Sequence, residues 1–480
     1  MKRASGVLMH ISTLYGDYSI GSFGDNAKDF IDFLSDCGFS YWQTLPFNMA
    51  DDCGSPYKSY GAFSGNPYFV DLDKLAQKGL LTVEELNAAK QSSPYSCEFE
   101  RLDKERFALL KTASSRVCGE DKEKIQRVIS KKKPIFDFCR FMALKEANNY
   151  SEWIDWKNDE YNDDTLFAWE FAEYEFLLQW NEIKSYANSK GIKIIGDIPI
   201  YVAYDSSDVW ANKNEFQLDA HGHLKAVAGV PPDYFSKDGQ LWGNPLYNWS
   251  AMKKNDFAWW RERIRYMFEL FDGVRIDHFR GIESYWSVPK EAKTAKEGKW
   301  VKGPGKKFVD TLREMAGEKL IIAEDLGDIT DDVVKLVDYS GFPGMRVLQF
   351  AFLGDYDSPH LPHNYINNCV AYTGTHDNNT LLGYMWEASD AVRRRVIDYC
   401  GMDEDWDKSY DNIIKSMLAS HAGLVIVPIQ DLLNFGSDTR MNIPGSADGN
   451  WRYRITREQL KQIDTEKYRY FNSLYARGKT

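Results

Sequence analysis

The stretch Asp272-Gly-Val-Arg-Ile-Asp-His-Phe-Arg280 organises the whole chain. Its residues Gly273, Val274 and Ile276 are typical of a short buried strand that follows a turn. Arg275, Asp277 and His278 bring three charged or titratable groups to the end of that strand. A carboxylate is costly to bury at such a place unless it is paired. One such pair is often only structural, but a strand ending in an acid recurs three more times along the chain.

Composition excludes several classes of protein. The chain has 480 residues, is 43% hydrophobic and 15% aromatic, and carries a net charge of −12 without a basic block. This balance argues against nucleic-acid and anionic-membrane partners. The seven cysteines are scattered and form no C-x-x-C pair, which favours reduced thiols. With no secretory pattern in residues 1–15 and no apolar run of about 20 residues, we expect a soluble cytoplasmic protein.

Apolar runs separated by helical stretches predict a parallel sheet with eight strands. Eight such units fit a (β/α)₈ barrel enlarged by insertions. A doubly wound open sheet is the alternative, but no G-x-G-x-x-G follows the first strand, which leaves a dinucleotide fold with little support. The expected strands are 6–9, 40–46, 192–202, 272–279, 320–326, 345–352, 370–376 and 423–428, the last running on to 431.

Domain organisation follows from the same pattern. We expect one catalytic barrel over 1–480, without a separate C-terminal β-domain. The pattern is helical over 72–189, which predicts a helical insertion after the second strand. Residues 203–250 are rich in Gly, Pro and Trp and predict a long loop subdomain after the third strand. A second long loop at 47–69 is dense in Gly, Ser and Tyr, and its length favours a functional role.

Four carboxylates end four of the expected strands: Asp197, Asp277, Glu324 and Asp377. In a barrel these ends open on one face, where catalytic residues lie. Metal binding is one use of such a cluster. Against it, cationic or potentially cationic side chains lie between these acids in the sequence and would compete with a metal for the carboxylates. Glycosyl transfer is the other, with one carboxylate as nucleophile and a second as general acid. These interleaved side chains are Arg275, His278 and His376.

The surroundings of two acids suggest different roles for them. Asp277 lies next to Arg275, which favours an ionised nucleophile. Glu324 follows an apolar strand, and partial desolvation would raise its pKa toward that of a general acid. A pH–rate profile without two limbs would count against this division of roles.

Several short motifs, in order along the chain, resemble the 4-α-glucanotransferases of the amylomaltase (disproportionating enzyme) family, glycoside hydrolase family 77 of the α-amylase clan. The similarity runs from about residue 6 to 455. The strand-end matches are Gly196-Asp-Ile-Pro-Ile-Tyr-Val202, Val274-Arg-Ile-Asp-His-Phe-Arg-Gly281, Ile322-Ala-Glu-Asp-Leu-Gly327 and Gly374-Thr-His-Asp-Asn-Asn379. Loop matches are Ser55-Pro-Tyr57, Ser64-Gly-Asn-Pro67, Asp205-Ser-Ser-Asp-Val-Trp210, Gly229-Val-Pro-Pro-Asp233, Trp242-Gly-Asn-Pro245 and Gly449-Asn-Trp451.

The resemblance implies Asp277 as nucleophile, Glu324 as general acid/base and Asp377 as transition-state stabiliser. It implies no cofactor and no metal, and maltodextrins and other 1,4-α-glucans as partners. A retaining mechanism would place the two reacting carboxyl groups about 5–5.5 Å apart. The substrate-binding residues that it implies are Asp197, Arg275, His278, His376, Tyr57, Asp233, Trp242, Asn244, Asn450 and Trp451, with the loop around 229–234 covering the cleft.

Three other functions compete with this expectation. An α-amylase-type retaining hydrolase would share every catalytic carboxylate and differ only in whether water or a sugar takes the intermediate. A silent glucan-binding protein would not need the trio Asp277, Glu324 and Asp377. A metal-dependent phosphoryl enzyme is the third, and His360 and His363 could suggest a metal pair, but no third ligand lies nearby in the sequence, so we expect them to be loop residues.

Overall fold

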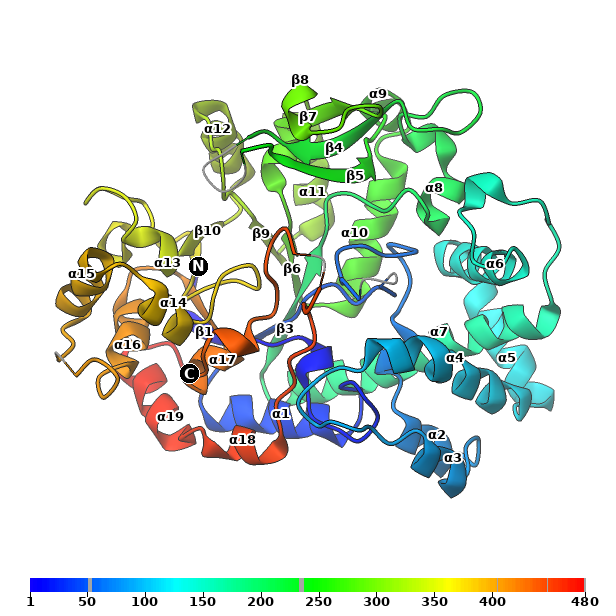
Figure 1. Cartoon of the computed structure of the whole chain (residues 1–480), viewed down its shortest axis with the longest axis horizontal. Helices are drawn as coiled ribbons and strands as arrows, with labels where there is room; N and C mark the ends of the chain where they lie inside the picture. Colours follow the sequence, from blue (N-terminus) through cyan, green and yellow to red (C-terminus); the bar gives the residue numbers. More distant parts are fainter. Residues whose placement is uncertain (51–53, 233–236, 404, 447, 479–480) are drawn as a thin grey trace.

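Eight parallel strands close into a barrel at the centre of the chain (Figure 1). The computed structural model describes residues 1–50, 54–232, 237–403, 405–446 and 448–478. Strand β1 pairs with both β2 and β12, so the predicted barrel is confirmed and the open sheet is wrong. The barrel strands are β1 (Ala4–Leu8), β2 (Tyr41–Gln43), β3 (Lys193–Ile198), β6 (Gly273–Ile276), β9 (Leu320–Ala323), β10 (Gly344–Val347), β11 (Cys369–Tyr372) and β12 (Leu424–Pro428).

Alternate residues of each strand face the inside and the outside of the barrel. On β3, Ile195 belongs to the small inner cluster, whereas Ile194 belongs to the large cluster beneath the helices. The hydroxyl of Tyr372 on β11 donates to Oε1 of Gln43 on β2 at 2.9 Å, across two intervening strands. The barrel is therefore filled with side chains and all its strands are fixed relative to one another.

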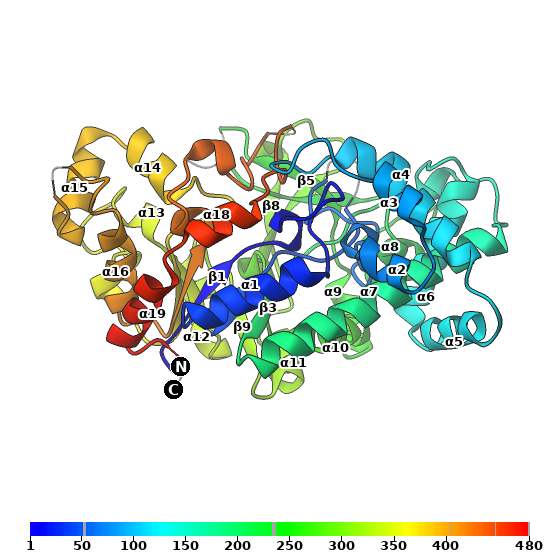
Figure 2. The same cartoon turned by 90° about the horizontal axis from the view of Figure 1, so that it is seen from below.

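Helices surround the barrel (Figure 2), and the segments around Arg3 and Arg477, near the two ends of the chain, are hydrogen-bonded to each other. Arg477 donates to the carbonyl oxygen of Ala4, and Arg3 donates to that of Tyr475. The covering helices are α1 (Asp25–Asp36), α10 (Ala258–Leu270), α11 (Lys306–Ala316), α12 (Asp331–Ser340), α14 (Leu381–Glu387), α15 (Asp390–Cys400), α16 (Asp411–Ala419), α18 (Arg457–Gln462) and α19 (Thr465–Leu474). After β12 the described residues add helices and loops but no further strand.

The chain between β2 and β3 is largely helical and lies to one side of the barrel in Figure 1. The longest helix there, α7, has a broad buried face because it packs on the barrel and on its neighbours. Nε1 of Trp180 on α7 donates to the carbonyl oxygen of Leu270 at 2.9 Å, which fixes this helix against α10. The six helices are α2 (Leu72–Gln77), α3 (Val83–Ala88), α4 (Phe99–Ser115), α5 (Gly119–Ser130), α6 (Lys133–Ala147) and α7 (Asp163–Ser189).

A second, four-stranded antiparallel sheet lies above the barrel in Figure 1 and was not predicted. Within 203–250, where we expected a long loop subdomain, two strands form a sheet with two strands that follow the 272–280 motif. The sheet, in the order β5-β4-β7-β8, consists of β4 (Ala226–Val230), β5 (Gln240–Pro245), β7 (Ser284–Pro289) and β8 (Lys299–Lys302). Strand β4 pairs with β7 and thereby joins the two pairs of strands. The same loop segment contains helix α8 (Ser207–Ala211).

Several expected boundaries also need correction: the strands expected at 40–46, 192–202, 320–326 and 370–376 end earlier, at Gln43, Ile198, Ala323 and Tyr372. The strand expected at 345–352 ends at Val347 and continues as α13 (Leu348–Ala351). The last strand ends at Pro428, so Asp431 lies in α17 (Ile429–Leu432) and not on the strand. Two helices, α9 (Trp249–Lys254) and α10, precede β6, and they are separate because Phe257 between them adopts a left-handed conformation with φ 55°. Among the described residues, no helix combines the length and apolarity that a membrane crossing requires.

Candidate active site

One guanidinium joins two strand-end carboxylates at the carboxyl end of the barrel. Nη1 of Arg275 on β6 donates to Oδ1 and Oδ2 of Asp197 on β3, at 2.9 and 2.7 Å. Nη2 of the same side chain donates to Oδ1 of Asp277, which directly follows β6, at 2.7 Å. The predicted pairing of these residues is thus present, and it satisfies a buried charge that would otherwise be costly.

The two carboxylates on Arg275 differ in exposure. Asp197 is buried, and this burial raises its pKa despite the opposing effect of Arg275. The Asp277 side chain is 29% exposed, so it can meet a ligand while it remains paired. Burial lowers the pKa of Arg275, but Asp197 and Asp277 outweigh it and raise the pKa well above its ordinary value. The guanidinium is therefore a fixed positive charge in this site.

Glu324, directly after β9, is held by two backbone N–H groups. Its Oε2 accepts from the N–H of His278 at 2.6 Å, and its Oε1 accepts from the N–H of Leu326 at 2.8 Å. Burial is the main reason that the pKa of Glu324 is raised to about 7, and the charge of Asp277 acts in the same direction. Arg275 and the two backbone N–H groups act to lower this pKa but do not outweigh burial. Because His278 is the neighbour of Asp277 in the chain, Glu324 and Asp277 lie on adjoining strand ends.

Asp377, five residues beyond the end of β11, is held on both of its oxygens. Nε2 of His376 lies 3.2 Å from Oδ2, and Nδ2 of Asn442 donates to Oδ1 at 2.7 Å. The Asp377 side chain is 48% exposed; its partial burial acts to raise its pKa, but His376 and Asn442 outweigh this effect and hold the pKa well below its usual range. Burial likewise acts to lower the pKa of His376, but Asp377 raises it above its ordinary value. Asp377 is therefore an oriented, charged carboxylate.

Tyr57 extends from the 47–69 loop into the cluster. Its hydroxyl donates to Oδ2 of Asp197 at 2.7 Å and lies 3.3 Å from Nδ1 of His376. Its ring stacks on the imidazole of His376 with centroids 4.8 Å apart, and the ring of Trp451 lies 5.9 Å from both. The loop thus connects the ends of β3 and β11 through one aromatic side chain.

His278 adopts a left-handed backbone conformation with φ 49°, which is strained for a residue with a side chain and is common at functional sites. Burial lowers the pKa of its imidazole to about 4, although Asp277 opposes this, so the ring is neutral near pH 7. Its Nε2 is buried without a hydrogen-bond partner in the part of the chain that the structure describes. Trp242 on β5 approaches it edge-on at 5.0 Å. An unused ring nitrogen here can bind a ligand hydroxyl.

The remaining predicted residues divide into two groups. Trp242 and Trp451 lie against the cluster through His278, Tyr57 and His376. The amides of Asn244 and Asn450 instead donate to backbone carbonyl oxygens, of Val202 and Ser446 respectively, and Asn450 also accepts from a loop N–H. Asp233 lies outside the described residues.

Sequence reasoning missed Asn442, and also Arg440, which donates to the carbonyl oxygen of Asp377 at 3.1 Å. Both lie in the loop after α17, in a stretch without a motif, and more than 60 residues from their partner. No signal in the sequence pairs them with Asp377. His360, whose Nδ1 accepts from the N–H of Val347, and His363, which lies against Tyr399, are loop residues as expected.

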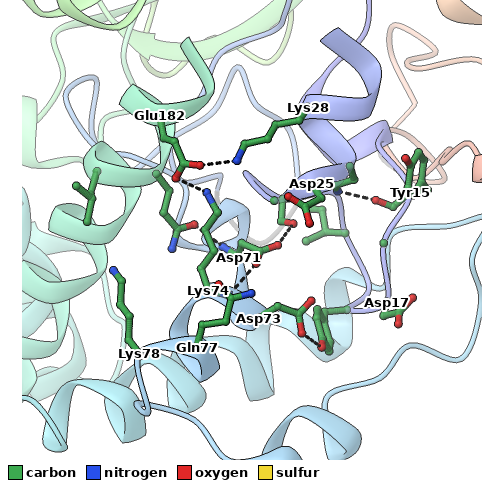
Figure 3. Close-up of a pocket in the computed structure, with 18 of the residues that line it drawn as sticks. Tyr15, Asp17, Asp25, Lys28, Asp71, Asp73, Lys74, Gln77, Lys78 and Glu182 are labelled. Carbon is green, nitrogen blue, oxygen red and sulfur yellow. Dashed lines mark hydrogen bonds and ion pairs between the residues drawn. The ribbon is translucent and has the colours of Figure 1, made fainter. Parts of the chain in front are cut away.

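A cavity of about 990 Å³ lies elsewhere, between the 15–26 loop, α2 and α7 (Figure 3). None of the described site residues lines it. Several of its charged side chains have partners: Lys28 and Lys74 both bind Glu182, and Asp73 accepts from the Tyr18 hydroxyl. The cluster of carboxylates at the strand ends is therefore the candidate active site, and it is separate from this cavity.

Comparisons with known proteins agree with the geometry of the strand ends. A family model described as 4-alpha-glucanotransferase matches residues 9–460. The 4-alpha-glucanotransferase of Clostridium butyricum is 44% identical over 93% of this chain and 95% of its own length. That of Streptococcus pneumoniae (strain TIGR4) is 42% identical over 99% and 98%.

A solved structure extends this similarity to the fold. The amylomaltase from Streptococcus agalactiae, solved in complex with acarbose, is 35% identical and superposes with a TM-score of 0.96 over 100% of both chains. These matches favour glucan transfer over the hydrolase alternative. The chain belongs to the 4-alpha-glucanotransferase family.

Proposed function

We propose that this 4-alpha-glucanotransferase works by a retaining double displacement, with Asp277 as nucleophile and Glu324 as general acid and base. One observation carries the proposal: two adjoining carboxyl groups have opposite surroundings. Asp277 is partly exposed and paired with Arg275, whereas Glu324 is buried with its pKa raised to about 7. Such a pair suits one group that attacks and one that transfers a proton.

In the first step the Asp277 carboxylate attacks the anomeric carbon of the donor glucose. The bond to the leaving oxygen breaks as Glu324 gives that oxygen its proton, which leaves a β-glucosyl ester on Asp277. In the second step the Glu324 carboxylate takes the proton of the acceptor 4-hydroxyl, and that oxygen attacks the same carbon. A new α-1,4 bond forms, Asp277 is released, and Glu324 is protonated again.

Asp377 would stabilise the transition state, and its neighbours would bind the reacting sugar. The support is that His376 and Asn442 orient both of its oxygens in a charged form. Such a group needs no reorganisation as charge develops on the sugar. Arg275 and Asp197 would complete the floor of this subsite, and the unpartnered Nε2 of His278 would donate to a sugar hydroxyl.

Tyr57, Trp242 and Trp451 would supply the apolar surface on which sugar rings pack. Their rings lie against His376 or His278 and so border the reacting carboxylates. The relative solved in complex with acarbose supports an α-glucan as the ligand of this chain. Asn244, Asn450 and Asp233 complete the proposed substrate-binding set.

We propose maltodextrins and other 1,4-α-glucans as donors and acceptors. In this proposal 1–480 is one catalytic unit, in which 72–189 and 203–250 are insertions that shape the glucan site. A cytoplasmic location is supported by the thiols, because the six described cysteines are all free: Cys37, Cys97, Cys118, Cys139, Cys369 and Cys400.

Incubation with maltotriose, without added cofactor or metal, tests the activity. We expect a ladder of longer maltodextrins together with free glucose and little gain in total reducing ends, because a sugar hydroxyl takes the intermediate. Product size analysis and a glucose assay measure both. A steady rise in reducing ends without longer products would instead identify a hydrolase, and binding without any product would leave only a glucan-binding protein.

Replacing Asn442 with Ala is expected to lower kcat/KM for maltotriose about tenfold, since a hydrogen bond to a charged group is worth about 1.5–3 kcal/mol. Asn442→Asp is expected to cost more, because it places a second carboxylate against Asp377. Steady-state kinetics measures both losses. Ser446→Ala, which removes a hydroxyl bonded within the same loop, is the control. Equal activity of all three variants would remove Asn442 from the proposed site.

A further inference from the structure

The position of Tyr57 depends on the loop that carries it. At its tip the loop is fixed by the Tyr57 hydroxyl on Asp197. At its base, residues 60–66 run along the helical insertion and α8. The groups that hold this base matter for the reaction, because a displacement of about 1 Å at a reacting group can cost about 100-fold in rate.

Two buried carboxyl groups from separate elements bind the backbone of this base. Both oxygens of Glu173 on α7 lie 3.0 Å from the N–H of Gly65, which donates to them. Oδ2 of Asp208 on α8 accepts from the N–H of Ala62 at 2.7 Å. Each acid is only 2% exposed. Burial raises the pKa of Glu173 to about 8 and that of Asp208 to about 6, while the loop N–H groups act in the opposite direction.

Close packing allows the loop to approach these acids. A Cβ on Gly65 would lie 2.3 Å from the ring of Phe176 on α7, and one on Gly61 would lie 2.8 Å from Phe138 on α6. Only glycine fits at either position without a shift of its neighbours. The N–H of Ser207 on α8 also donates to the carbonyl oxygen of Tyr60 at 2.8 Å. The loop base is thus pressed onto three helices while its backbone groups are bonded.

Burying a carboxyl group costs free energy, and an apolar side chain could fill the same space without that cost. An apolar side chain of similar size would fill the place of Glu173, yet would leave the N–H of Gly65 without a partner. The carboxyl groups are therefore best explained by the backbone donors that they satisfy. These donors, the N–H groups of Ala62 and Gly65, lie five and eight residues after Tyr57 along the same loop.

We propose that Glu173 and Asp208 are positioning residues for Tyr57: they fix the base of its loop and thereby place its hydroxyl on Asp197. This inference rests on the proposed place of Tyr57 in the donor site. It also gives the helical segment between β2 and β3 a part in the reaction, since Glu173 belongs to its longest helix.

A double-mutant cycle tests the proposal on maltotriose transfer. Glu173→Leu is expected to lower kcat/KM about tenfold in the otherwise unchanged enzyme, and by less than about twofold in a Tyr57→Ala background, because coupled sites are not additive. Glu173→Gln keeps an acceptor oxygen and is expected to stay within about twofold of the wild type. Asp208→Leu and Asp208→Asn form a second, parallel series.

Glu170→Leu is the matched control. Glu170 lies one turn earlier on α7, is 3% exposed, and is influenced by Gln126 and Lys122 of α5 and not by the Tyr57 loop. Thermal unfolding of each variant gives the folded fraction to which kcat/KM is normalised. The control is expected to lower stability, as the other α7 variants do, without a loss of kcat/KM per folded molecule.

The possible outcomes separate this proposal from the assignment of Tyr57. Losses that shrink in the Tyr57→Ala background and are rescued by Gln or Asn support positioning. Losses that multiply fully with Tyr57→Ala in both series, or that Glu170→Leu reproduces, overturn it. Unchanged activity of Tyr57→Ala alone would reject the place of Tyr57 in the donor site. If Glu173→Leu does not fold, the Asp208 series decides.

Discussion

Asp277→Ala is expected to lower glucan transfer from maltotriose by about 10,000-fold or more, because no other group can form the glycosyl ester. Oδ1 of Asp277 accepts from Nη2 of Arg275 at 2.7 Å, and the Asp277 side chain is partly exposed, so the carboxylate is both oriented and accessible. Its removal leaves the binding residues in place, so KM should change far less than kcat. Steady-state kinetics with maltotriose measures the two constants separately.

Rescue by azide and a matched control variant test whether the loss is due to the missing nucleophile. With α-maltosyl fluoride as donor, azide should enter the space left by the missing carboxylate and give the β-maltosyl azide, with partial return of donor turnover. Asp272, at the start of β6, accepts from the N–H of Ile194 and lies at the opposite end of the strand. Asp272→Ala should therefore affect stability and not chemistry. Full activity of Asp277→Ala, or an α-configured azide product, would contradict the assignment.

Glu324→Gln is expected to slow transfer from maltotriose about 100- to 10,000-fold, the usual contribution of a positioned acid. The sign of the pH dependence follows from the raised pKa of about 7. The first step needs the protonated form, so wild-type activity should fall as the pH rises through this value. The variant should lose that alkaline limb. A pH–rate profile from pH 5 to 9 measures both.

Fluoride leaves without protonation, so α-maltosyl fluoride should still glycosylate the Glu324→Gln variant. The control is Asp325→Asn, next in the chain, whose carboxylate binds Arg346 and the N–H of Met345 outside the reacting pair. It should keep the alkaline limb. An alkaline limb that survives in Glu324→Gln would show that another group supplies the proton.

The barrel could be predicted from the sequence because its signals are local. Each strand is a short apolar run bounded by turn residues, and parallel pairing of consecutive units needs no further information. The second sheet could not be predicted in the same way. Val227 on β4 pairs with Val288 on β7, which comes after the site motif, and no local pattern specifies such a distant partner. The run 345–352 was misread because an apolar run has no period that separates strand from helix.

The site shows the same division. Asp277 and Arg275 are two residues apart on one strand, so their pairing follows from the sequence, and the strand ends bring Asp197 to the same guanidinium. Asn442 reaches Asp377 only because the loop after α17 folds back over the barrel end. Glu173 lies on a helix where an acid normally indicates a solvent-facing side. Its burial depends on the Tyr57 loop, which no pattern within α7 reveals.

In the proposed mechanism the donor sugar is carried on Asp277. Glu324→Gln is treated with α-maltosyl fluoride, so that the first step proceeds and the second lacks its base, and the protein is digested and analysed by mass spectrometry. We predict one maltosyl group on the peptide that contains Asp277. A maltosyl group on any other residue, or turnover of the donor with inversion and without an adduct, would contradict the mechanism.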